Sequence, residues 1–274
     1  MKLNHINYLI LLLFVVLFFR VVDADDQLPP QTTWQTSLKE MVFGNDHIFD
    51  GKDIISLETP YRALDAAIVP IKVKFNKVQD KNFFVKHITV VVDENPSPVV
   101  GKFSTFLKTG SADISTRVRV DKYTYVRAIA EMSDGKKYMV QNFVKAAGGC
   151  SAPSLADMDT VMNRLGKMKM KFLDTSLKGQ VNKAKLVISH PNFSGLQFNQ
   201  LTRTEIPAHF VDSVSITQDE RKILEITPDI SLSEDPNITF HYINSGGPLN
   251  VIVTDSDGGK FTKSWPVDQL ISKN

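Results

Sequence analysis

Short apolar runs with an alternating pattern constrain the fold of this chain more than any other feature. From about residue 68 onward, apolar and polar side chains alternate in stretches such as Ile68–Phe75, Phe84–Val92 and Lys185–Ser189. A period of two places successive side chains on opposite faces of a β-strand. Turn residues separate the runs, and within each half of the chain no helical pattern lies between them. The sequence therefore predicts an all-β chain built from β-sandwiches rather than βαβ units.

Two turns predict hairpins within this pattern. Asp134-Gly135 and Asp257–Gly259 each lie between two alternating runs, and Asp-Gly in that position is a strong hairpin signal. The other expected strands are residues 116–120, 169–172, 210–216, 222–226 and 237–242.

Helices are expected in only two places. One is Trp34–Phe43, ended by Gly44, and the other is Leu155–Leu165, ended by Gly166. The second helix divides the alternating runs into two groups. We therefore expect two sandwiches, at residues 25–147 and 168–274, separated by an arm and linker at residues 148–167.

The N-terminal segment predicts export. Lys2 precedes the apolar run Tyr8–Phe19, and Val22-Asp23-Ala24 follows it, which is the pattern of a secretory signal peptide at residues 1–24. The run is shorter than the roughly 20 residues that a membrane-spanning helix needs. An uncleaved anchor is the alternative. After cleavage we expect no membrane span.

The charge pattern argues against nucleic-acid binding. The net charge is +2, and Lys and Arg are spread among Asp and Glu. Arg117, Arg119 and Arg127 alternate along strands, which predicts a solvated sheet face. The six histidines are scattered. His190 and His209 are expected to have hydrogen-bonding roles, and neither a metal nor a cofactor is expected.

Cys150 is the single cysteine, so the chain forms no internal disulfide. Gly148 and Gly149 precede it and widen the backbone freedom of the segment. The run predicts a reactive thiol on a flexible arm, and an incidental surface thiol is the alternative. The sequence leaves open whether the resting thiol is exposed or folded back against a sandwich. An exposed thiol predicts a homodimer linked through Cys150 on oxidation.

Several segments resemble the two subunits of a sulfur carrier. Glu94–Phe103, Ser115–Val120, Val126–Glu131 and Gly148–Cys150 are similar to SoxY, the thiosulfate-oxidation carrier protein. Ser189–Leu196, Ile206–Phe210 and Asp255–Gly258 are similar to its partner subunit, SoxZ. The chain therefore resembles a SoxY–SoxZ fusion, of the type described as quinoprotein dehydrogenase-associated SoxYZ-like carriers.

The resemblance implies a fold and a role. It implies two immunoglobulin-like sandwiches packed together, with Cys150 as the attachment residue for sulfur intermediates and Gly148-Gly149 as the hinge. It also implies a periplasmic location. In SoxY the arm is the free C-terminus, with glycines on both sides of the cysteine. Here Ser151 and Ala152 follow the cysteine and the chain continues, so the arm is tethered.

Three functions follow from these observations. The leading hypothesis is a non-enzymatic periplasmic carrier that presents sulfur intermediates on Cys150 to partner redox enzymes. The alternative is a docking module for a quinoprotein (alcohol) dehydrogenase and its cytochrome, in which the thiol is dispensable. A thiol hydrolase is the third hypothesis, but a flexible arm is a poor place for a preorganised catalytic triad.

Overall fold

The computed structural model describes residues 28–153, 158–174, 178–199 and 202–267. The predicted signal peptide and the start of the predicted second helix lie outside these residues. The chain from Gln31 onward forms one compact unit. Within the described residues, no helix has the length and apolar character needed to cross a bilayer.

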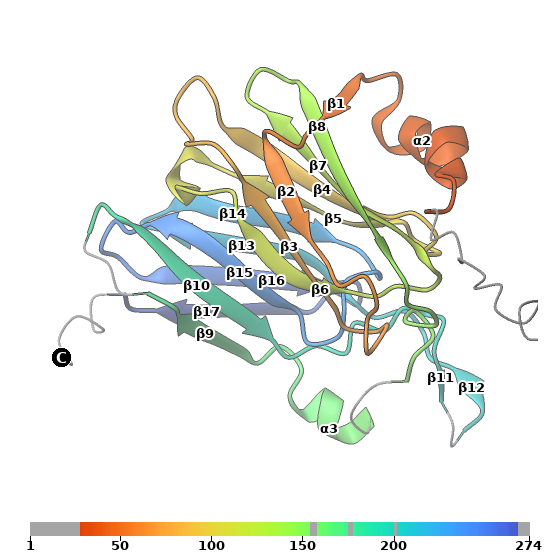
Figure 1. The fold of residues 1–274 in the computed structure, drawn as a ribbon. Coiled ribbons are helices and arrows are strands. Elements are labelled where there is room, and N and C mark those ends of the chain that lie inside the picture. The colour runs from red at the N-terminus through yellow and green to blue at the C-terminus, as the bar shows by residue number, and fades with distance from the viewer. Residues whose placement is uncertain (1–27, 154–157, 175–177, 200–201, 268–274) are drawn as a thin grey trace, which may run out of the picture. The chain divides into compact units, whose positions relative to one another are not determined.

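Two large β-sheets make up most of the fold (Figure 1). The nine-stranded sheet has the order β1 (Ile48–Asp50), β8 (Lys137–Val144), β7 (Thr124–Met132), β4 (Val85–Val92), β5 (Val99–Thr105), β14 (Arg221–Pro228), β13 (Val211–Gln218), β16 (Leu249–Asp255) and β17 (Lys260–Trp265). The six-stranded sheet has the order β2 (Ile55–Glu58), β3 (Val69–Phe75), β6 (Ile114–Val118), β15 (Asn237–Ile243), β10 (Val181–Ile188) and β9 (Met168–Phe172). A small third sheet pairs β11 (Phe198–Asn199) with β12 (Thr204–Glu205). The predicted all-β class is confirmed.

Both large sheets contain strands from both halves of the chain. In one sheet β5 pairs antiparallel with β14, with Phe103 opposite Ile226. In the other, β6 meets β15, with Ser115 opposite Thr239. A single hydrophobic core runs through both halves. The two halves therefore meet edge to edge, because β5 and β6 of the first half pair with β14 and β15 of the second, and the predicted division into two sandwiches at residues 25–147 and 168–274 stays a prediction.

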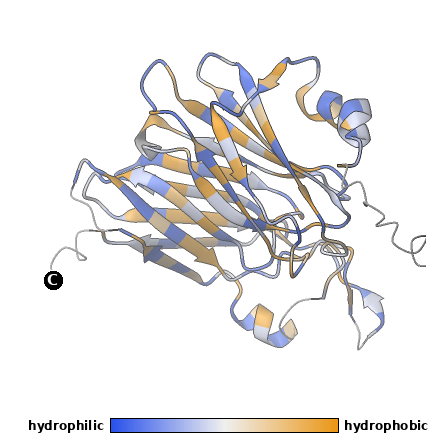
Figure 2. Ribbon diagram, in the orientation of Figure 1, coloured by the Kyte–Doolittle hydropathy of each residue, from blue (hydrophilic) through white to orange (hydrophobic). Residues whose placement is uncertain are grey.

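The alternation of the sequence appears as an alternation of burial. In β10 every second side chain is buried, from Asn182 to Ile188, and the hydropathy colours alternate along the strands (Figure 2). Both predicted hairpins are present, as the antiparallel pairs β7–β8 and β16–β17.

The predicted N-terminal helix is confirmed as a π-helical turn, η1 (Trp34–Leu38), that continues into α2 (Lys39–Phe43) and ends at Gly44. Trp34 and Leu38 are buried against Val91 and Ile129 of the nine-stranded sheet. This contact covers the outer face of the sheet, so β7 is buried along almost its whole length. The remaining helices are η2 (Leu107–Thr109) and α3 (Met158–Asn163), and α3 lies within the second predicted helix.

Candidate functional site

Cys150 is a free cysteine and is fully buried. Of the two resting positions that the sequence leaves open, the structure has the folded-back one. Residues 148–153, here called the cysteine segment, contact both halves of the chain. The expected homodimer through an exposed thiol therefore requires this segment to leave its place first.

The two glycines of the cysteine segment have different structural roles. Gly148 is exposed and has φ of +80°, a backbone conformation that glycine adopts most easily. The N–H of Gly149 donates to the carbonyl of Val120 at 2.9 Å. A Cβ atom on Gly149 would lie 2.1 Å from the carbonyl oxygen of Ala66. Gly149 thus allows a close backbone approach, and its role as a hinge stays a prediction.

A loop from the second half holds the other side of the cysteine segment. We call His190–Gln197 the docking loop. The hydroxyl of Ser194 donates to the carbonyl of Cys150 at 2.5 Å. The side-chain amide of Gln197 donates to the carbonyl of Ala152 at 2.8 Å. All these contacts are hydrogen bonds, so the segment is docked by interactions that can break and re-form.

Burial raises the pKa of the Cys150 thiol to about 12. The charge of Asp121 acts in the same direction, and that of Arg119 acts in the opposite direction. The nucleophilic form of a cysteine is the thiolate. The docked thiol is therefore neutral and unreactive at neutral pH, and chemistry on Cys150 requires the segment to open.

Arg119 lies beside the cysteine segment and is 1% exposed. Its Nη1 donates to the carbonyl of Gly149 at 3.0 Å, and its Nη2 donates to the carbonyl of Asn192 in the docking loop at 3.2 Å. Its Nε has no hydrogen-bond partner, and it forms no ion pair with a carboxylate of the described residues. Burial lowers the pKa of Arg119, while the charge of Glu234 raises it.

The prediction of a solvated arginine face is wrong for two of its three residues. Arg119 and Arg127 are buried, and only Arg117 is half-buried. Arg127 is covered because η1 packs on the outer face of the sheet, with Trp34 4.5 Å from its guanidinium. Arg119 lies just after the end of β6, where Val118, Arg119 and Val120 are all buried and the alternation stops.

The fold also brings together His190, His209 and Asp255, whose ligating atoms lie within 4.8 Å of one another. His209 Nε2 lies 3.0 Å from Asp255 Oδ2, and His190 Nε2 lies 3.4 Å from the same oxygen. The backbone N–H of Asn192 donates to His190 Nδ1 at 3.0 Å. Nδ1 of neutral His190 is therefore the acceptor, and Nε2 carries the proton.

The proton on Nε2 of His190 decides between hydrogen bonding and metal ligation in this cluster. A metal on Nε2 would need that nitrogen without its proton, so the arrangement favours hydrogen bonds from His190 to Asp255 over metal ligation. The hydrogen-bonding roles expected of His190 and His209 are therefore confirmed. Burial lowers the pKa of His190 to about 4. The cluster anchors the start of the docking loop to β16.

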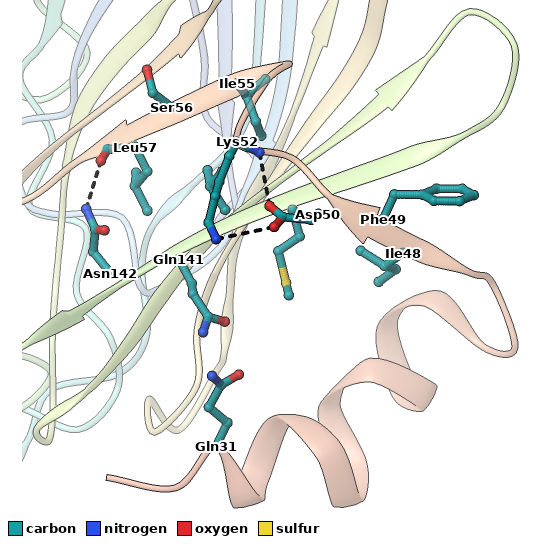
Figure 3. Close-up of a pocket in the computed structure, with 12 residues that line it drawn as sticks. Gln31, Ile48, Phe49, Asp50, Lys52, Ile55, Ser56, Leu57, Gln141 and Asn142 are labelled. Carbon is teal, nitrogen blue, oxygen red and sulfur yellow. Dashed lines mark hydrogen bonds and ion pairs between the residues drawn. The ribbon is translucent and has the colours of Figure 1, made fainter. Parts of the chain in front are cut away.

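A separate cavity of about 460 Å³ opens between β1, β2 and β8 (Figure 3). Asp50 and Lys52 form an ion pair of 3.3 Å at its rim, and Asn142 donates to the carbonyl of Leu57 at 2.8 Å. None of the residues that line the cavity belongs to the cysteine segment or the docking loop. The cavity is thus distinct from the Cys150 site.

The sequence located Cys150, Gly148 and Gly149 but missed Arg119 and the docking loop as parts of the same site. Ser194 is 44 residues from Cys150 along the chain, and Asn192 is 73 residues from Arg119. The one signal in the sequence that points to the stretch Ser189–Leu196 is its resemblance to SoxZ.

Each half of the chain matches a model of a known protein family. The family model "Sulfur oxidation protein SoxY" matches residues 39–150, so the match ends at Cys150. The family model "Sulphur oxidation protein SoxZ" matches residues 170–266. No curated protein matches the chain.

Solved structures resemble parts of the chain. The sulfur carrier protein SoxY from Chlorobium limicola f thiosulfatophilum is 22% identical over 39% of this chain and 87% of that chain, with a TM-score of 0.32. A superoxide reductase (neelaredoxin) from Ignicoccus hospitalis is 11% identical over 34% of this chain and 79% of that chain, with a TM-score of 0.30. At these TM-scores the structures add nothing to the assignment, which depends on the two family models. The chain therefore belongs to the SoxY and SoxZ sulfur-oxidation carrier families, whose domains it joins in one polypeptide.

Proposed function

We propose that this protein carries sulfur-containing groups covalently on Cys150 and presents them to partner redox enzymes of sulfur oxidation in the periplasm. The observation that supports this most directly is the position of Cys150. It is the single cysteine of the chain and the last residue of the SoxY match. Its segment is held by hydrogen bonds and by the packing of a buried side chain, so it can be released without breaking a covalent bond.

The carrier works by alternating between two positions of the cysteine segment. When the segment is docked, Cys150 is buried and its thiol is neutral. When the segment is released, the pKa of the thiol returns towards its ordinary value of about 8.5, and the thiolate becomes available for attack on a sulfur donor. Gly148 and Gly149 are the proposed hinge. The protein has no catalytic residues of its own in this proposal, and the chemistry belongs to the partners.

Intact mass of the native protein tests the proposal. We expect a fraction of molecules purified from cells grown on reduced sulfur compounds to carry extra mass on the Cys150 peptide. Reductant should remove this mass. In the same cells Cys150→Ser should abolish sulfur oxidation, whereas Ser151→Ala, which changes the neighbouring exposed hydroxyl, should leave it intact.

Two outcomes would contradict the carrier. One is an unmodified thiol under every growth condition. The other is full function of the folded Cys150→Ser protein, which would instead support a docking module, such as one for a quinoprotein dehydrogenase and its cytochrome.

A further inference from the structure

Arg119 is a buried cation that forms no ion pair within the described residues. Isolated charges are expensive to bury, and buried arginines are normally paired with a carboxylate. The charges of Glu234 and Asp65 raise the pKa of Arg119 and so offset part of the cost of its burial, while its guanidinium donates hydrogen bonds to two backbone carbonyls. The Nε–H donor of Arg119 is buried and unused.

The unpaired charge lies next to the residue that carries the cargo. Nη1 of Arg119 donates to the carbonyl of Gly149, the residue directly before Cys150. Since Arg119 also donates to Asn192, its guanidinium lies between the cysteine segment and the docking loop. The docked site therefore has a positive charge and a free donor, while the unmodified thiol supplies no negative charge to match them.

Building on the proposed carrier function, we propose that Arg119 binds the negative end of the group attached to Cys150, so that the docked site selects anionic sulfur adducts over neutral ones. A persulfide (Cys–S–S⁻) and a thiosulfate adduct (Cys–S–S–SO₃⁻) both belong to this class. Either would accept a charge-assisted hydrogen bond from the guanidinium in a site of low dielectric. A neutral adduct would leave Arg119 uncompensated and would add only bulk.

Three forms of the full-length mature protein test this proposal. The first is the free thiol. The second is made with tetrathionate: the Cys150 thiolate attacks an inner sulfur, the central S–S bond breaks, and thiosulfate leaves with the electron pair. The third is made with methyl methanethiosulfonate: the thiolate attacks the methylthio sulfur, the S–SO₂ bond breaks, and methanesulfinate leaves. This third form carries a neutral –S–S–CH₃ group.

Hydrogen exchange at Gly148 and Gly149 reports whether the segment is docked, because their N–H groups donate to the carbonyls of Asp121 and Val120. We expect these two amides to exchange at least about tenfold more slowly in the thiosulfate adduct than in the methylthio form. One additional hydrogen bond between charged groups in the docked state would slow opening of the segment by about this factor. This comparison needs no variant. Equal exchange in the two forms, or slower exchange in the neutral form, would overturn the proposal.

A variant then assigns the effect to Arg119. In Arg119→Gln the difference between the anionic and neutral adducts should disappear, and in Arg119→Lys part of it should remain. Arg117→Gln is the matched control, since Arg117 is half-buried, lies two residues away and donates to the carbonyl of Asp235 at 3.0 Å. It should keep the full difference. A full difference in a folded Arg119→Gln protein would also refute the role of Arg119.

These adducts are made in vitro, so the result does not depend on the natural cargo. If the carrier function fails because no adduct forms in cells, the exchange experiment can still succeed. If the exchange experiment refutes the role of Arg119, Cys150 can still be the residue that carries the cargo.

Discussion

Arg119 and Arg127 are both fully buried among the residues that the structure describes, and their surroundings differ sharply. Arg127 donates from Nε and Nη2 to Asp93 at 2.8 and 2.6 Å, and its guanidinium stacks on Trp34. Arg119 donates only to two backbone carbonyls and has no partner for Nε. The first charge is paired directly with a carboxylate, whereas the second is offset only through the charges of groups such as Glu234 and Asp65.

The difference separates a structural site from a functional one. The Arg127 site ties η1 to the sheet and is complete without any ligand. The Arg119 site joins the cysteine segment to the docking loop and leaves the Nε donor of the guanidinium without a partner. A buried polar group that lacks a partner in a folded protein calls for an explanation, and our proposal is that an anionic group on Cys150 is that partner.

The largest effect is expected at Arg127. Arg127→Met should leave Asp93 buried without its partner and lower the free energy of unfolding by about 3–5 kcal/mol. Burial already raises the pKa of Asp93, and Arg127 opposes that shift. Urea unfolding at pH 7 measures the change. The double variant Arg127→Met with Asp93→Leu should recover much of the loss, and a single variant with unchanged stability would refute the structural role.

A second effect concerns the anchor of the docking loop. Burial lowers the pKa of His190 to about 4 from 6.5. The unfolded chain therefore binds a proton at a pH where folded His190 remains neutral. The stabilisation is complete above pH 6.5 and is lost as the pH falls towards 4, by up to about 3 kcal/mol. Unfolding measured from pH 7 to pH 4 should show this slope, and His190→Gln should flatten it. An equally steep slope in the variant would contradict the assignment.

A smaller loss of stability is expected at Arg119. Arg119→Met removes hydrogen bonds to two carbonyls but also removes a buried, uncompensated charge. We expect these effects to offset in part and the free energy of unfolding to fall by about 1–2 kcal/mol. The same variant should react faster with iodoacetamide at Cys150, because the cysteine segment loses a contact. A loss as large as that of Arg127→Met would remove the distinction between the two arginines.

The smallest effect is expected at Ser194. Ser194→Ala removes one hydrogen bond to the cysteine segment, a contribution of about 1 kcal/mol. If segment opening limits the reaction, Cys150 should be alkylated about fivefold faster while global stability changes little. Ser37→Ala is the control, since the hydroxyl of Ser37 bonds only within its own helix. Unchanged alkylation would show that Ser194 does not hold the segment closed.

The sequence predicted those parts of this protein that depend on local patterns. The alternation and Asp134-Gly135 predicted strands and a hairpin, and Gly44 marked the end of the first helix. It did not predict the burial of Arg119 and Arg127, because alternation alone does not tell which face another element will cover. It also did not predict the docked state of Cys150, because Ser194 and Asn192 lie far away along the chain and carry no local signal of contact.

The end of β8 at Val144 sets a length scale for any partner of this protein. Cys150 is the sixth residue beyond Val144, and a fully extended chain spans at most about 3.3–3.6 Å per residue. If β8 stays paired, the sulfur-bearing residue can travel no more than roughly 20 Å from the sheet. Because the chain returns to α3 on the other side, it must enter a partner as a doubled strand. If Cys150 is the carrier residue that we propose, a partner enzyme therefore needs a shallow, wide entrance rather than a deep, narrow tunnel.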